Sequence, residues 1–215
     1  MTGSTDMPSR FLGDAPAEIR NVLDWFNAGQ ARGGPPPHLA EFAGRFLGAL
    51  HDDGAVLPDI TEDSAPQTLA LVLLHHTKSP ESAGAWLNLG LALRRMALHR
   101  TQDPEEVNGR RLRHALEALE RSLQLDPDNM GKNIRAWTGE SFVYHALGSY
   151  EDELRCCSRA LEADRSDPKL WLFYGFALRS AGRKREALSV MDDAYQAYVE
   201  AGEPEELRNV FAGIR

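Results

Sequence analysis

The chain of 215 residues contains only two cysteines and no long run of apolar side chains. Its longest apolar run, residues 69–74, is far shorter than the roughly 20 residues that a membrane-spanning helix needs. The cysteines, Cys156 and Cys157, are adjacent. Because neighbours on a helix point about 100° apart, they should not bridge each other. The N-terminal residues lack a basic stretch followed by an apolar core. We therefore expect a cytoplasmic protein with reduced cysteines and no membrane contact.

The sequence also lacks the short motifs that mark common catalytic sites. It has no GxxxxGK[ST] phosphate loop, GxGxxG dinucleotide motif, GxSxG elbow or HExxH zinc motif. The pairs His75-His76 and Cys156-Cys157 contain metal-binding side chains. However, adjacent residues on a helix diverge, and the two pairs are far apart in the chain. We expect no metal, no cofactor and no catalytic residue, and a metal-dependent enzyme is the least favoured hypothesis.

Basic residues are fewer than acidic residues, 24 compared with 32, which gives a net charge of -8. This balance disfavours binding to nucleic acid or to an anionic membrane. The densest basic cluster consists of Arg110, Arg111 and Arg113. An electrostatic contact to phosphate or to an acidic protein is conceivable there. A solvated helix face is the favoured interpretation, because Glu117 and Glu120 continue the same segment with the opposite sign.

Helical periodicity dominates the chain, and no window alternates strictly between apolar and polar residues. The sequence therefore predicts an all-α fold. We divide it into a flexible N-terminus at 1–14, an N-terminal helical cap at 15–81, a repeat array at 82–201 and a C-terminal capping helix at 202–215. The cap includes a proline- and glycine-rich loop at 29–37.

An internal repeat is visible in the second half. A shift of 34 residues superimposes identical residue types, pairing Trp137 with Trp171, Gly148 with Gly182, and Ala160 with Ala194. The last copy reads Trp171-x2-Tyr174-Gly175-x2-Leu178, followed by Gly182, Ala187-x3-Met191 and Ala194. This pattern resembles the tetratricopeptide repeat. Small residues at Gly175 and Ala187 should let paired helices approach closely, while Gly182 should make the turn between them.

The other two copies depart from the pattern. The middle copy carries Glu140, Ser141 and Glu153 where the family has leucine, glycine and alanine. An earlier copy starts at Trp86. The separation between its tryptophan and its alanine, Ala115, is 29 residues, whereas the separation between Trp171 and Ala187 in the last copy is 16 residues. Thirteen residues are therefore inserted, including the polar stretch 101–108. We expect this insertion to lengthen the helices or the turn of the first repeat.

The resemblance implies a right-handed superhelix of helical hairpins with a concave groove. In that family the first helix of each repeat lines the groove. The lining positions lie two residues before the tryptophan and one, five and eight residues after it. These positions hold Gly84, Leu87, Leu91 and Arg94, then Arg135, Thr138, Phe142 and His145, then Lys169, Leu172, Phe176 and Arg179. The predicted surface is apolar at its centre and basic at its edges, and it carries no carboxylate.

Such a surface predicts a non-catalytic adaptor or assembly factor that binds an acidic partner segment with apolar anchors. Of the residues with which chaperone-adaptor repeats hold a terminal carboxylate, only Lys169 has a counterpart. An alternative is a structural subunit that docks into a larger complex through its convex face or its N-terminal cap. A further alternative is that the terminal helices of the chain fill the groove. The sequence leaves these alternatives and the oligomeric state open.

Overall fold

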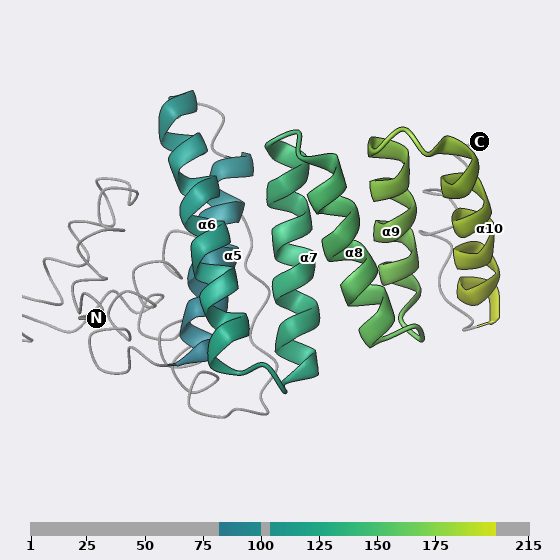
Figure 1. Cartoon of the computed structure of the whole chain (residues 1–215), viewed down its shortest axis with the longest axis horizontal. Coiled ribbons are helices and arrows are strands. Elements are labelled where there is room, and N and C mark those ends of the chain that lie inside the picture. Colours follow the sequence, from purple (N-terminus) through teal and green to yellow (C-terminus); the bar gives the residue numbers. More distant parts are fainter. Residues whose placement is uncertain (1–81, 100–103, 201–215) are drawn as a thin grey trace, which may run out of the picture. The chain divides into compact units, whose positions relative to one another are not determined.

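The computed structural model describes residues 82–99 and 104–200, and within these ranges the chain is helical with no strand (Figure 1). The helices are α5 (Ala83–His99), α6 (Glu105–Leu125), α7 (Met130–Ala146), α8 (Tyr150–Ala163), α9 (Pro168–Ser180) and α10 (Lys184–Glu200). The predicted all-α class is confirmed for this part. None of these helices combines the length and apolarity needed to cross a bilayer. The predicted flexible N-terminus, N-terminal cap and capping helix at 202–215 lie outside the described residues.

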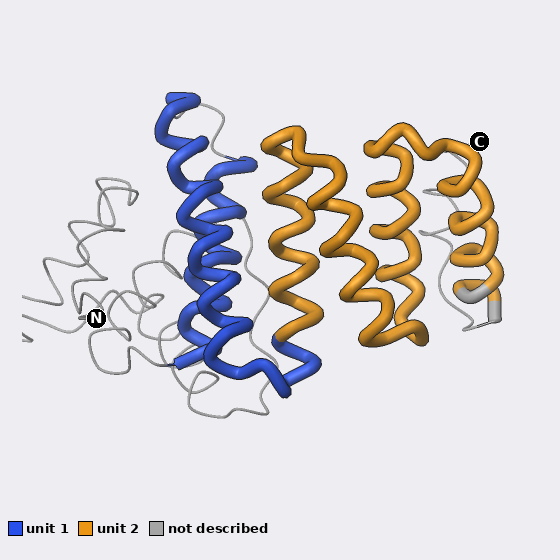
Figure 2. The backbone as a smooth tube through the Cα atoms, viewed as in Figure 1, with its two compact units in different colours: residues 1–132 blue, residues 133–215 orange. Residues whose placement is uncertain are grey.

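The chain divides into two compact units, residues 1–132 and 133–215 (Figure 2). In the first unit, α5 packs against α6 at very short range. A Cβ atom placed on Gly90 would lie 2.6 Å from Cγ of Leu119 and 3.0 Å from the carbonyl oxygen of Ala115. Since such distances leave no room for a side chain, glycine sets the approach of the two helices.

Helices α5 and α6 are longer than α9 and α10 on both sides of the connecting turn. Helix α5 continues thirteen residues beyond Trp86, whereas α9 continues nine beyond Trp171. Helix α6 begins ten residues before Ala115, whereas α10 begins three before Ala187. The sequence left open whether the helices or the turn would be longer, and most of the additional residues lie in the two helices.

In the second unit, α8 and α10 each pack against α9. One buried cluster joins α8 to α9 and α10, and it comprises Leu154, Cys157, Ala177, Leu178 and Ala187. A second joins α9 to α10, and it comprises Leu172, Met191, Ala194 and Tyr198. Trp137 and Trp171 pack against a third, formed by Ala160, Leu161 and Leu170. The repeated tryptophans therefore serve interhelical packing.

Glycines lie in two of the three interhelical turns of this unit, between α7 and α8 and between α9 and α10. Gly148 follows α7 with a φ of 73°, and Gly182 follows α9 with a φ of 77°. In the second turn the amide of Arg183 donates to the carbonyl oxygen of Leu178 at 2.9 Å, which satisfies a carbonyl at the helix end. Residues with a Cβ atom avoid this left-handed conformation, so the predicted role of Gly182 is confirmed.

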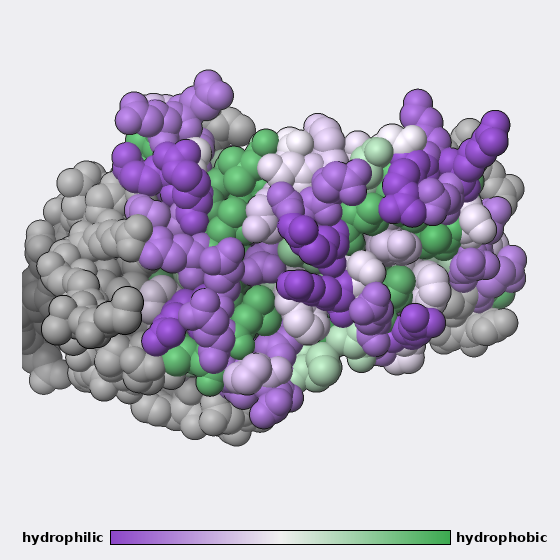
Figure 3. Space-filling model, viewed as in Figure 1, coloured by the Kyte–Doolittle hydropathy of each residue, from purple (hydrophilic) through white to green (hydrophobic). Residues whose placement is uncertain are grey.

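Hydrophilic residues cover much of the described surface in the view of Figure 3, with apolar patches between them. The large apolar side chains that remain exposed are Met130, Phe142, Leu147, Tyr150, Leu188 and Val199. Scattered apolar side chains are normal on a protein surface. Phe142 differs from the others because it borders a pocket.

Candidate binding site

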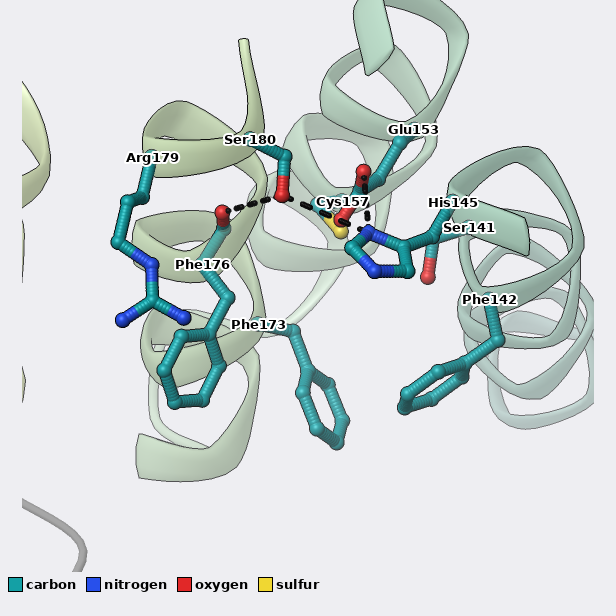
Figure 4. Close-up of a pocket in the computed structure, with 9 residues that line it drawn as sticks. All are labelled: Ser141, Phe142, His145, Glu153, Cys157, Phe173, Phe176, Arg179 and Ser180. Carbon is teal, nitrogen blue, oxygen red and sulfur yellow. Dashed lines mark hydrogen bonds and ion pairs between the residues drawn. The ribbon is translucent and has the colours of Figure 1, made fainter. Parts of the chain in front are cut away.

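Helices α7, α8 and α9 of the second unit enclose a pocket of about 260 Å³ (Figure 4). It is lined by Ser141, Phe142 and His145 of α7, Glu153 and Cys157 of α8, and Phe173, Phe176, Arg179 and Ser180 of α9. The side chains come from three helices because residues three or four apart share one helix face. The pocket therefore combines an aromatic wall with a small number of polar groups.

Phenylalanines form the apolar wall. The rings of Phe142 and Phe173 meet edge to face, with centroids 5.4 Å apart and an interplanar angle of 75°. The guanidinium carbon of Arg179 lies 5.1 Å from the ring centroid of Phe176, a distance typical of cation–π contacts. Phe142 is 37% exposed, and Arg179 is exposed as well. The apolar wall is thus open to solvent and has one cation at its edge.

His145 and Glu153 form the polar wall. Oε2 of Glu153 lies 3.0 Å from Nδ1 of His145, and the glutamate side chain is only 8% exposed, against 57% for the histidine. Oγ of Ser180 lies 3.4 Å from the same nitrogen and donates to the carbonyl oxygen of Phe176 at 3.1 Å. Figure 4 shows the second ring nitrogen of His145 pointing away from Glu153 and Ser180.

This trio does not have the geometry of a catalytic triad. In a triad the acid holds one nitrogen of the imidazole, and the nucleophile bonds to the opposite nitrogen, which takes its proton as a general base. Here Glu153 and Ser180 approach the same nitrogen, Nδ1. The hydroxyl of Ser180 also donates its proton to a backbone carbonyl. The arrangement positions the imidazole and does not activate the serine.

The two thiols are suited to packing. Cys156 and Cys157 are buried and unbridged, as the sequence predicts. Burial raises the pKa of Cys157 to about 12. Burial and the carboxylate of Glu140, which accepts from the Cys156 thiol at 3.5 Å, raise the pKa of Cys156 still more. Both groups are therefore neutral thiols at ordinary pH, whereas a nucleophile or a metal ligand is a thiolate.

Within the described ranges, no cluster of three or more histidine, cysteine, aspartate or glutamate residues could hold a metal ion. His75 and His76 lie outside these ranges. The segment Asp126–Asn129 is a turn: the amide of Asn129 donates to the Asp126 carbonyl oxygen at 3.3 Å, and the Asn129 side chain accepts from the amide of Lys132 at 3.2 Å.

Four of the predicted groove residues come together in the pocket, namely Phe142, His145, Phe176 and Arg179. The other four in this unit do not line it. Arg135 and Thr138 are half-buried earlier on α7, and Lys169 is exposed at the start of α9. Leu172 is buried against α10 instead.

The groove residues predicted in the first unit differ in exposure. Leu87 has no exposed surface and Leu91 is 9% exposed, so neither presents an open surface for a partner. Gly84 and Arg94 are half-buried. Burial, together with the adjacent charge of Arg95, lowers the pKa of Arg94 to about 10.

Five pocket residues were absent from the predicted set: Ser141, Glu153, Cys157, Phe173 and Ser180. A signal for two of them exists in the sequence. In the 34-residue alignment, Ser141 falls opposite Gly175 and Glu153 opposite Ala187. A polar side chain at a position that packs helices together must find a polar partner, and here it forms part of a pocket wall.

No protein-family model matches the chain, and no curated protein is similar enough to match it. Its function is therefore inferred from the pocket and from the spacing of its repeats.

Proposed function

We propose that the chain is a cytoplasmic, non-catalytic adaptor or assembly factor. Residues 82–201 form three tetratricopeptide-like repeats of a right-handed superhelix. The pocket of the second unit binds a segment of a partner protein that carries a large apolar anchor next to acidic residues. The apolar wall supplies affinity, and the cation at its edge favours the acidic flank.

One observation carries the proposal: groove residues predicted from two different repeats, Phe142 and His145 with Phe176 and Arg179, line one solvent-accessible pocket. That these four side chains from two repeats lie together supports the proposal. The guanidinium of Arg179 contacts the ring of Phe176 and makes no salt bridge with the described residues. Its charge is available to an acidic partner.

The size of the pocket favours a side chain over a small-molecule cofactor. Pockets for drug-sized ligands occupy roughly 300–1,000 Å³, and this one has about 260 Å³. A single large side chain of a partner fits such a volume. Interfaces of this kind concentrate their binding energy in a few aromatic and arginine residues around a buried anchor.

Peptide selection tests the proposal directly. A random peptide library is panned on the purified chain and on the double variant Phe142→Ala/Phe176→Ala. The matched control, Met130→Ala/Leu188→Ala, removes two exposed apolar side chains that do not line the pocket. We expect wild type and control to select acidic peptides with a large apolar residue, and the pocket variant to lose them.

Circular dichroism and urea denaturation establish that each variant is folded before binding is compared. Selection of the same peptides by wild type and the pocket variant would contradict the proposal. It would instead favour docking through another surface, as in the structural-subunit alternative.

A further inference from the structure

The hydrogen bonds around His145 determine which of its ring nitrogens carries a proton. A carboxylate only accepts hydrogen bonds, so Nδ1 must donate to Oε2 of Glu153, 3.0 Å away. Ser180 is compatible with this assignment, because its hydroxyl donates to the carbonyl oxygen of Phe176 at 3.1 Å and leaves Oγ, 3.4 Å from Nδ1, as an acceptor. The carboxylate of Glu153 therefore requires Nδ1 to be protonated.

A neutral imidazole protonated at Nδ1 has a lone pair at Nε2. Nε2 makes no hydrogen bond to any described residue, and it points away from Glu153 and Ser180 (Figure 4). The pocket thus presents one hydrogen-bond acceptor beside three phenylalanines. An aliphatic anchor or phenylalanine would cover this acceptor without pairing it, which costs binding free energy.

From this we propose that the partner's anchor is an aromatic side chain carrying a hydrogen-bond donor, which it gives to Nε2 of His145. Tryptophan and tyrosine share this chemistry, because each has a large apolar ring and a polar N–H or O–H. The inference rests on the proposed function and narrows it, since it specifies which anchor the pocket selects.

Short acidic peptides of identical flanking sequence provide the test on the full chain. One pair carries tryptophan or 1-methyltryptophan at the centre, and a second pair carries tyrosine or phenylalanine. Within each pair the rings are similar and the second member lacks the donor; 1-methyltryptophan also carries an additional methyl group, whereas phenylalanine adds nothing to the ring. Their dissociation constants are measured by fluorescence anisotropy at about pH 8. The ratio of the two constants within a pair cancels the contribution of the shared acidic flanks.

At about pH 8 we expect the donor-bearing member of a pair to bind about two- to tenfold more tightly, which corresponds to one hydrogen bond. In His145→Phe, which lacks the acceptor, the ratio within each pair should be one.

Equal binding within both pairs at about pH 8, together with loss of binding in Phe142→Ala/Phe176→Ala, would overturn this inference and leave the proposed function intact. Absence of binding by every peptide, acidic leucine and phenylalanine versions included, would overturn both. The comparison within a pair uses unmodified protein, so the result does not depend on the folding of the His145 variant.

Discussion

Ser122 and Ala83 lie 39 positions apart in the chain and are joined by a buried hydrogen bond, in which Oγ of Ser122 donates to the carbonyl oxygen of Ala83 at 2.8 Å. The bond connects the last turn of α6 to the first turn of α5. A serine within a helix more commonly bonds to a carbonyl of its own preceding turn. The contact to another helix fixes the register of the pair at this end.

Substitution of Ser122 by alanine should lower the free energy of unfolding by about 0.5–1.5 kcal/mol, because a buried hydrogen bond is lost. The matched control is Ser158→Ala. Ser158 donates to Glu162 at 3.1 Å on the surface, and its removal should change stability by less than about 0.5 kcal/mol. Urea denaturation measures both. Equal stabilities of Ser122→Ala and wild type would show that the bond contributes nothing.

Close glycine contacts predict a ranking of two alanine substitutions. A Cβ at Gly90 meets branched Leu119 and the backbone of Ala115 at 2.6–3.0 Å, whereas at Gly175 it meets the flexible side chain of Met191 at 2.8 Å. Overpacking costs about 1–3 kcal/mol, and methionine adapts more readily than leucine or backbone. Gly90→Ala should therefore destabilise more than Gly175→Ala. In a Met191→Ala background, the cost of Gly175→Ala should disappear.

Gly109 is the matched control for both substitutions. It lies within α6, and a Cβ atom placed on it would have as its nearest neighbour the guanidinium of Arg113, 3.7 Å away. With no steric conflict, Gly109→Ala should raise the free energy of unfolding by about 0.5–1 kcal/mol through backbone entropy alone. If all three substitutions stabilise the protein in denaturation experiments, the helices can separate at no cost and the packing argument is wrong.

The repeat spacing predicted the features of this fold that depend on a single helix hairpin. Gly182 was identified as a turn residue and Gly175 as a close-contact residue because both roles follow from their offset to Trp171. The same offsets identified Phe142, His145, Phe176 and Arg179 as sharing one surface. Leu172 was predicted on that surface as well, but it is buried against α10. Its exposure depends on the neighbouring helix, which the offset within its own helix does not describe.

Side-chain partners were the part that sequence patterns could not supply. Arg111 was expected on a solvated face with Arg110 and Arg113, and this expectation is wrong. The residue is 3% exposed, and its Nη1 donates to Asn108 at 2.9 Å. A long arginine can bury its stem when its charged head finds a polar partner. Mixed charge along a helix does not reveal that pairing.

The buried thiols of Cys156 and Cys157 predict how stability changes in alkali. Their pKa values are raised in the folded state, that of Cys157 to about 12, while a thiol in an unfolded chain ionises near about 8.5. Above that pH the unfolded chain has lost a proton that the folded chain retains. The thiols' contribution is therefore complete below about pH 8.5 and is lost as the pH rises towards about 12.

The free energy of unfolding should accordingly fall between about pH 8.5 and 10, with a slope approaching about 1.4 kcal/mol per pH unit for each thiol. The variant Cys156→Ala/Cys157→Ala should be less stable at about pH 7.5, because buried atoms are removed, but its decline with pH should be shallower. Other residues that ionise in this range are common to both proteins, so they cancel in the difference. Urea denaturation under reducing conditions at several pH values measures it. Parallel curves would mean that the thiols ionise as readily in the folded protein as in the unfolded chain, which contradicts the effect of their burial.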